Sequence, residues 1–279
     1  MVLFAASYTV TKVALVDIGP FTLGAVRFLL ATVLIAAWIG IRGGWERPTP
    51  EDAKRLALGG LLGVTLYFAL ENLGVSWARA SDATMLSAVF PAVIALVDVV
   101  ANGARVGRRG WIGIALAMVG SVPIVLGAPE QGGGDESRRL WGCVLILLAG
   151  VAWAFYTFVT RDVVGRYSSW TTVLWQDGVG ALAFIPLALT EAPGWHLPTH
   201  PGPTISAVLA LTVLCSVLAM VFYAAAVRHL STALVAASIN LVPLFGLVIA
   251  LVVLHEGVGW WQVFGCLVVI AGVVVSHRD

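Results

Sequence analysis

Charge is what this chain has little of. Its 16 Lys and Arg and 15 Asp and Glu residues make up 11% of the 279 positions, whereas soluble proteins carry about 25% charged residues. The formal net charge is +1, so no basic surface for a nucleic acid is expected. Hydrophobic residues reach 59% of the chain. This composition indicates an all-α polytopic membrane protein in contact with the lipid bilayer.

Several chemistries are missing as well. There is no phosphate-binding glycine-rich loop with Lys and Ser or Thr, and no second histidine four residues after His255 as in metalloproteases. No G-x-S-x-G nucleophile motif occurs. The three cysteines lie inside apolar runs, where they behave as small hydrophobic residues. We therefore expect no enzyme, no cofactor and no metal site.

Long apolar runs fill most of the chain. Residues 231–254 and 258–276 hold 24 and 19 residues without a charge, and about 20 apolar residues suffice for a helix to cross a bilayer. The polar elbow His255-Glu256-Gly257 between them predicts an antiparallel helix pair. Ten spans are expected in all: 1–16, which is short for a crossing, 21–41, 53–73, 81–101, 110–127, 140–160, 170–189, 204–227, and the two runs just described.

The runs also repeat along the chain. Shifted by 152 positions, residues 79–124 fall on residues 231–276 without a gap, and a second match has an offset of 149. We interpret the chain as two five-helix copies, 1–127 and 140–279, joined by a flexible linker at 128–139. Because five is odd, the second copy must be inverted. The matched pairs are Pro91 with Pro243, Gly113 with Gly265, Gly120 with Gly272, Lys12 with Arg161, and Arg27 with Gln176.

The basic residues predict an orientation. With the amino terminus in the cytoplasm, the inner loops and ends hold eleven Lys and Arg residues and the outer loops hold three. An excess of basic residues marks the cytoplasmic side. Both termini are therefore expected in the cytoplasm.

Asp177 is the sharpest candidate for function, since it lies in the middle of a span beside Gln176. An ionisable residue there costs about 2.5–3.5 kcal/mol on insertion scales. It can contact a substrate or a coupling proton in a water-filled cavity. It can equally form a buried ion pair or hydrogen bond that fixes helix packing, for instance with Arg27. The residues alone leave both interpretations open.

Other polar and aromatic residues could line the same cavity, although helix ends at the interface and ordinary packing explain them too. Tyr67 and Glu71 share a helix face; Lys12 can instead extend to the interface, and Asn240 can satisfy backbone groups near Pro243. The predicted substrate-binding residues are Lys12, Tyr67, Glu71, Asn72, Trp153, Tyr156, Gln176, Asp177 and Asn240.

Prolines and glycines carry structural predictions. Pro91 and Pro243 each fall inside a span and are predicted hinges, although a kink can also serve static packing. Glycines seven residues apart, at 113 and 120 and at 265 and 272, and the pair Gly59 and Gly63, predict closely packed helices, with a homodimer face as the lesser alternative. Glu256 is expected at the start of the tenth span, where the helix dipole favours a carboxylate.

The chain resembles the EamA-type transporters of the drug/metabolite transporter superfamily. The segments that carry the resemblance are 4–12, 20–28, 231–243, and His255-Glu256 followed by Trp261 and Gly265. The resemblance implies ten helices in two inverted repeats around a central cavity, and secondary transport of small metabolites, often outward. The chain departs from the family at Phe4-Ala5, where Trp-Gly is common, and at Ala104, where the family has an acidic residue.

We therefore predict a secondary transporter in the cytoplasmic membrane. It would move a small metabolite or drug-like solute by alternating access, with export as the favoured direction. The alternatives are an intramembrane enzyme, which would need a nucleophile and a base brought together at depth, and a membrane scaffold that transports nothing.

Overall fold

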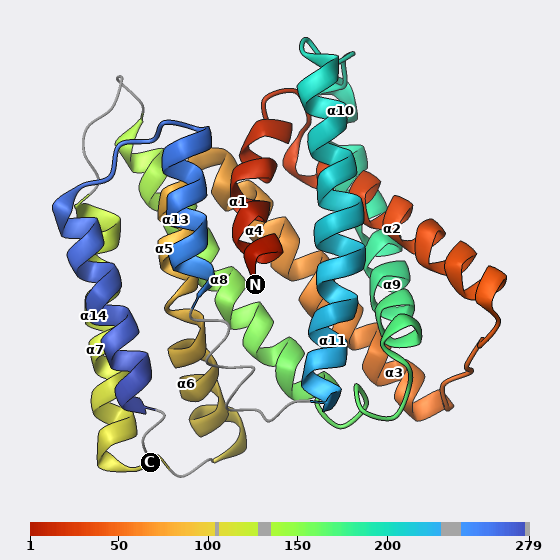
Figure 1. The fold of residues 1–279 in the computed structure, drawn as a ribbon, viewed down its shortest axis with the longest axis horizontal. Coiled ribbons are helices and arrows are strands. Elements are labelled where there is room, and N and C mark those ends of the chain that lie inside the picture. Colours follow the sequence, from red (N-terminus) through yellow and green to blue (C-terminus); the bar gives the residue numbers. More distant parts are fainter. Residues whose placement is uncertain (104–105, 128–134, 230–240, 277–279) are drawn as a thin grey trace. The chain divides into compact units, whose positions relative to one another are not determined.

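The computed structural model describes residues 1–279 except 104–105, 128–134, 230–240 and 277–279, and regular structure in this described part is helical throughout (Figure 1). The first half contains α1 (Val2–Ala14), α2 (Pro20–Arg42), α3 (Pro50–Gly59), η1 (Gly60–Leu66), α4 (Tyr67–Trp77), α5 (Ala80–Ser87), α6 (Phe90–Asn102) and α7 (Arg108–Leu126). The second half contains α8 (Glu136–Thr160), α9 (Ser169–Thr190), η2 (Ala192–Gly194), α10 (Pro201–Ala210), η3 (Leu211–Ala219), α11 (Met220–His229), α13 (Val242–Val253) and α14 (Trp260–Ser276).

Each of the ten predicted runs overlaps at least one helix. Within the described residues, six helices are long and apolar enough to cross a membrane, and the bent pair α5–α6 can count as a seventh; α1, α13 and α14 are shorter. Large apolar side chains such as Val33, Val119 and Trp260 are exposed, as expected of helices that face lipid. The six long helices are Pro20–Arg42, Pro50–Trp77, Arg108–Leu126, Glu136–Thr160, Ser169–Thr190 and Pro201–His229.

Two of the long helices change their winding in the middle. The span α3–η1–α4 is π-helical over η1, and the span α10–η3–α11 is π-helical over η3. These are the third span of each predicted copy, and the two π-helical stretches begin 151 positions apart. Short π-helical stretches often occur at functional sites, so η1 and η3 are candidate positions for one.

The fourth predicted span is broken rather than continuous. Its two pieces, α5 and α6, meet at a bend of 48°, and Pro91 lies in the first turn of α6. Proline is tolerated there because the first N–H groups of a helix have no intrahelical acceptor. Pro243 likewise lies in the first turn of α13. The predicted position of Pro91 inside one continuous helix is therefore wrong, and its role as a hinge stays a prediction.

The chain folds into two compact units that do not coincide with the two halves of the sequence. Unit 1 comprises residues 1–9, 74–155 and 236–279, and unit 2 comprises 10–73 and 156–235. Three of the four boundaries between units fall inside α1, α4 and α8, and the fourth lies outside the described residues. Helix α8 begins at Glu136, so the last residues of the predicted linker are helical. The predicted repeats are segments of similar sequence, whereas the units are sets of segments in contact. The units therefore do not test the predicted repeats.

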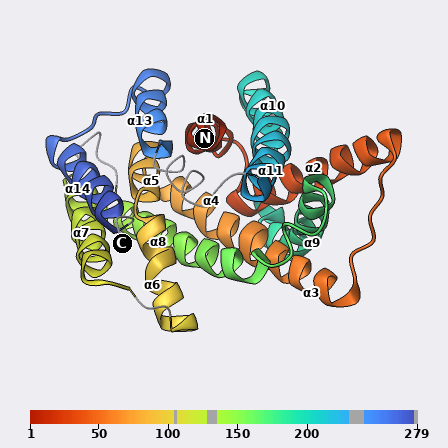
Figure 2. The ribbon, with the colours of Figure 1, turned by 60° about the horizontal axis from the view of Figure 1, so that its bottom comes forward.

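In unit 1, α7 and α14 lie side by side and antiparallel (Figures 1 and 2). A Cβ atom added to Gly113 would lie 2.4 Å from the carbonyl oxygen of Gly272, and one added to Gly265 would lie 2.6 Å from that of Gly120. The close approach predicted from these glycines is thus confirmed. An offset of 152 relates Gly113 to Gly265 and Gly120 to Gly272. The two glycine contacts are therefore equivalent, and each copy contributes the same surface to the contact.

In unit 2, α2 and α9 form the corresponding antiparallel pair. Phe28 of α2 stacks on Phe184 near the end of α9 with ring centroids 6.2 Å apart. Trp38, near the end of α2, contacts Trp170 at the start of α9 with centroids 5.5 Å apart. Aromatic pairs at such distances add to the burial of apolar area, and they align the two helices that carry the polar residues described below.

Carboxylates from distant segments cap the starts of these two helices. Glu191 accepts hydrogen bonds from the backbone N–H groups of Phe21 and Thr22 at 3.0 and 2.7 Å. Glu46 accepts one from the N–H of Ser168, just before α9, at 2.7 Å. The first N–H groups of a helix lack intrahelical acceptors, and the dipole favours negative charge there. Each helix of the pair is therefore capped from the loop that follows the other.

A third cap lies in the turn between α1 and α2. Asp17 accepts hydrogen bonds from the N–H groups of Thr199 and His200, both at 3.1 Å, and from the hydroxyl of Thr204 at 2.5 Å. The hydrogen bonds from Thr199 and Thr204 hold the pKa of the Asp17 carboxyl well below its usual range. The ionised Asp17 carboxylate thus fixes the start of α10.

Candidate functional site

Two opposite charges lie buried inside unit 2. Asp177 of α9 is 0% exposed and Arg27 of α2 is 1% exposed. Their charges interact, yet none of the ion pairs in the described part of the chain includes Arg27. Neither carboxylate oxygen of Asp177 has a hydrogen-bond partner among the described residues. The structural alternative, an Asp177–Arg27 ion pair, is therefore not formed.

Arg27 is held in place by other contacts. Its Nε donates a hydrogen bond to the hydroxyl of Ser216, on the π-helical stretch η3, at 2.5 Å. Its guanidinium lies over the rings of Phe68 and Phe28, 4.5 and 5.0 Å from their centroids. Such cation–π contacts can stabilise a desolvated cation by about 2 kcal/mol. The remaining donor Nη1 has no partner among the described residues, so this fixed cation keeps a donor available for an anionic group.

A second carboxylate lies on α4. The hydroxyl of Tyr67 donates a hydrogen bond to Glu71 Oε2, which confirms that these two residues share a helix face. Glu71 is 2% exposed, and its charge also interacts with Arg27. Beside it, the amide nitrogen of Asn72 donates to the carbonyl oxygen of Pro20 at 3.0 Å. Asn72 thus anchors the start of α2, and its role in binding substrate stays a prediction.

Glycines of the π-helical stretch η1 let α8 and α9 approach closely. A Cβ atom at Gly60 would lie 2.4 Å from the carbonyl oxygen of Gln176, and one at Gly63 would lie 2.4 Å from the ring of Tyr156. The packing role predicted for Gly63 is confirmed. The hydroxyl of Tyr156 donates to Gln176 Oε1 at 3.3 Å. The glycines therefore bring Tyr156 into contact with Gln176, the residue that precedes Asp177 in the chain.

The structure brings most of the predicted residues together but not all of them. Lys12 lies in the last turn of α1 and is partly buried. Trp153 is partly buried on the part of α8 that belongs to unit 1, and Asn240 lies outside the described residues. We use the term buried polar cluster for the connected residues of unit 2: Arg27, Tyr67, Glu71, Tyr156, Gln176, Asp177 and Ser216.

Sequence reasoning missed part of this cluster. Arg27 was considered as a partner for Asp177 and as the position matched to Gln176, but not as a binding residue, and Ser216 and Phe68 were not singled out. The signal for Arg27 was present, because a charge inside an apolar span needs a reason. Ser216 lies 189 positions away along the chain, and no local pattern links the two residues.

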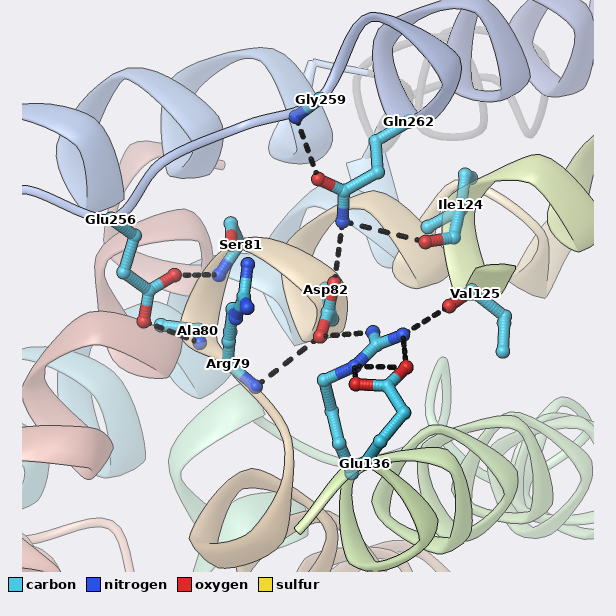
Figure 3. Close-up of polar contacts among 11 residues, drawn as sticks. Arg79, Ala80, Ser81, Asp82, Ile124, Val125, Glu136, Glu256, Gly259 and Gln262 are labelled. Carbon is cyan, nitrogen blue, oxygen red and sulfur yellow. Dashed lines mark hydrogen bonds and ion pairs between the residues drawn. The ribbon is translucent and has the colours of Figure 1, made fainter. Parts of the chain in front are cut away.

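Unit 1 contains a different buried charge, which the sequence analysis also missed (Figure 3). Asp82 of α5 is 0% exposed and accepts hydrogen bonds from Arg139 Nη1 at 2.9 Å and from Gln262 Nε2 at 2.6 Å. The backbone N–H of Arg79 adds a third contact at 3.4 Å. Arg139 in turn bonds to Glu136 and to the carbonyl oxygen of Val125. This Asp82 network ties together the ends of α5, α7, α8 and α14.

Glu256 completes the polar end of unit 1 (Figure 3). Its carboxylate accepts hydrogen bonds from the N–H groups of Ala80 and Ser81 at 3.0 and 2.8 Å. The expectation that it sits at the start of the tenth span is therefore wrong, since it caps α5 instead. At the start of α14 the amide oxygen of Gln262 accepts from the N–H of Gly259 at 3.0 Å. Because Gln262 already caps the start of α14, the Glu256 carboxylate is free to accept hydrogen bonds from the N–H groups at the start of α5, which have no acceptor within the helix.

Comparisons with known proteins agree with this picture. The model of the EamA-like transporter family matches residues 1–126 and again residues 140–277. A protein of Archaeoglobus fulgidus named as an uncharacterized transporter is 32% identical over 99% of this chain and 94% of its own length. A protein of Streptantibioticus cattleyicolor named as a probable terminal-alkyne amino-acid exporter is 28% identical over 100% and 91%. The uncharacterized inner membrane transporter YedA of Escherichia coli is 24% identical over 84% and 73%.

A solved crystal structure has the same fold. It superposes with a TM-score of 0.68 over 99% of this chain and 92% of the other chain, at 19% sequence identity. At this identity the likeness concerns the fold alone.

Proposed function

Because the chain belongs to the EamA-like transporter family, we propose that it is a secondary transporter that carries a small metabolite or drug-like solute across the cytoplasmic membrane by alternating access, with export as its direction. The buried polar cluster is the observation that carries the proposal. Buried charges within apolar helices commonly mark substrate or ion pathways. Here Arg27 and Asp177 keep unused hydrogen-bonding groups, as a binding site requires.

Alternating access in such carriers depends on inverted repeats, and three observations support them here. The family model matches the chain twice. The α7–α14 contact is reciprocal under the offset of 152, and η1 and η3 occur at equivalent places in the two copies. We therefore propose ten spans, with α1, α13 and α14 completing the set, and two cytoplasmic termini as the loop charges predict.

Free amino acids are the first class of solute to test. One relative is named as a probable amino-acid exporter. An amino acid carries an ammonium and a carboxylate, and the buried polar cluster offers an unpaired carboxylate at Asp177 and an unused guanidinium donor at Arg27. Oppositely charged groups held in a desolvated site would complement both ends of such a solute.

The test is flux through the purified protein in proteoliposomes. A pool of radiolabelled L-amino acids is offered outside vesicles loaded with the same amino acids, and exchange is measured. We expect exchange by the wild type and a large loss in Arg27→Met and Asp177→Asn. Asp162→Asn is the matched control, because Asp162 is an exposed carboxylate paired only with surface arginines. Wild-type exchange in both cluster variants would count against the assigned site.

A further inference from the structure

The isolation of Asp177 calls for a physical explanation. An ionised carboxylate buried without full pairing carries a desolvation penalty of several kcal/mol. The described residues give it no hydrogen bond to offset this penalty. A bound proton removes the charge and with it most of the penalty. In the conformation seen here, a protonated Asp177 is therefore the physically consistent state.

The groups around Asp177 allow the proton to leave again. Arg27 is a buried cation, 1% exposed, whose charge favours the ionised form of Asp177. It lies on α2, which packs against α9, and it is fixed on Ser216, Phe28 and Phe68. Its charge therefore favours the carboxylate once water reaches the site, without closing into an ion pair that would hold the carboxylate permanently ionised.

The charged groups on the other elements packed against α9 are exposed or engaged in ion pairs. The tyrosines Tyr156 of α8 and Tyr223 of α11 are neutral near pH 7. On α3, Asp52 and Arg55 are engaged by Arg166 and Asp162. The stretches η1 and η2 carry no titratable side chain. The remaining titratable groups on α3 and α11 are exposed, namely Glu51, Lys54, Arg228 and His229.

We propose that Asp177 is the proton-binding group of a proton/solute antiporter. This inference rests on the proposed transport function and names the ion that drives it. Facing outward, the Asp177 carboxylate takes up one proton, and the neutral carboxyl crosses to the inward-facing state. There the arriving solute displaces the proton: the O–H bond breaks, the proton enters the cytoplasm, and a cationic group of the solute neutralises the carboxylate. The return step carries the solute out, so that an inward flow of protons drives export.

A metal cation in place of the proton is disfavoured by the site. Hard cations bind through several oxygen ligands, and the described residues contain no group of three or more His, Cys, Asp and Glu side chains that could hold a metal ion. A proton needs only the carboxyl itself. The experiments below therefore include a sodium gradient as the competing driving force.

The first experiment needs no solute. Infrared difference spectra of the reconstituted protein between pH 5 and pH 9 would show the carbonyl stretch of a protonated carboxyl, identified by its shift in D₂O. We expect this band in the wild type and in Asp162→Asn near pH 7, and its loss in Asp177→Asn. An identical band in Asp177→Asn, or none in the wild type, would overturn the proposal. Because no transport is measured, this result stands apart from the success of the proposed function.

The second experiment separates coupling from transport. Vesicles with an interior one pH unit more acidic than the outside, at zero membrane potential, are offered radiolabelled L-amino acids. One proton per solute predicts about tenfold accumulation, since one pH unit corresponds to about 1.4 kcal/mol. In Asp177→Asn we expect no accumulation above the outside concentration, and in Asp162→Asn the wild-type value. Accumulation by the wild type under a sodium gradient, or flux indifferent to pH, would overturn the proposal.

Discussion

Two aspartates, one in each unit, are equally buried but differ in their hydrogen-bond partners. Asp82 and Asp177 are both 0% exposed. Asp82 receives hydrogen bonds from Arg139, Gln262 and the backbone of Arg79, whereas Asp177 receives none from the described residues. A buried charge with good partners can be a structural element, while one without partners persists only where function requires it. In unit 1, the buried carboxylate of Asp82 thus holds helix ends together. In unit 2, the carboxylate of Asp177 stays available for a proton or a solute.

The largest effect should come from removing the partner of Asp82. In Arg139→Met the Asp82 carboxylate loses its cation in a buried site, and breaking a buried pair costs about 3–5 kcal/mol. We expect loss of folded protein, measured by thermal unfolding in detergent. Arg138→Met is the matched control, since Arg138 is exposed and stacks on Trp77. Partial recovery of stability in the double variant Asp82→Asn/Arg139→Met would support a structural role for the Asp82–Arg139 pair, and an Arg139→Met protein as stable as the control would contradict it.

A second prediction concerns the glycine contact of unit 1. Gly120→Leu places a side chain against the backbone of α14, where a Cβ atom already lies 3.0 Å from the carbonyl oxygen of Gly265. Overpacking of this kind destabilises by about 1–3 kcal/mol. In Gly40→Leu the new Cβ meets nothing within 4 Å, and the better helix propensity should stabilise by up to about 1 kcal/mol. Opposite shifts in unfolding temperature are expected, and equal shifts would show that the α7–α14 contact does not limit stability.

Glu71 is the intermediate case, because Tyr67 gives it a hydrogen bond. Tyr67→Phe removes the donor and keeps the ring. The loss of one hydrogen bond to a charged group predicts a destabilisation of up to about 3 kcal/mol. This loss of stability is smaller than the one expected for Arg139→Met. Thermal unfolding and amino-acid exchange are measured together. A stability loss as large as that of Arg139→Met would show that Glu71, like Asp82, is a structural carboxylate rather than a functional one like Asp177.

The smallest effect is a dependence on pH at the Asp17 cap. Its pKa is lowered in the folded protein, so its contribution to stability is complete above the unfolded value of about 3.9 and is lost as pH falls through the folded pKa. Asp17→Asn should therefore unfold at a lower temperature than the wild type at pH 6, and the difference should shrink as the pH is lowered below 4. A difference that is constant with pH would mean that ionisation of Asp17 does not matter.

The features predicted correctly from the sequence are those with local signals. Apolar runs gave the helices, seven-residue glycine spacing gave the α7–α14 contact, and four-residue spacing gave Tyr67 with Glu71. The Asp82 network has no such signal, since Arg139 and Gln262 lie 57 and 180 positions from Asp82. Glu256 was assigned to the adjacent helix, although it caps one 175 to 176 positions away. Only the folded chain shows which buried charge finds partners and which does not.

The most direct test compares Asp82→Asn with Asp177→Asn in one set of measurements: thermal unfolding in detergent, and amino-acid exchange and proton-driven accumulation in proteoliposomes. Asp82→Asn should lower stability by about 1–3 kcal/mol, with exchange per folded molecule retained. Asp177→Asn should keep or raise stability, because a neutral amide replaces an unpaired acid, and should lose proton-driven accumulation. Destabilisation of Asp177→Asn to the level of Asp82→Asn, with wild-type accumulation retained, would contradict the division between a structural and a functional carboxylate.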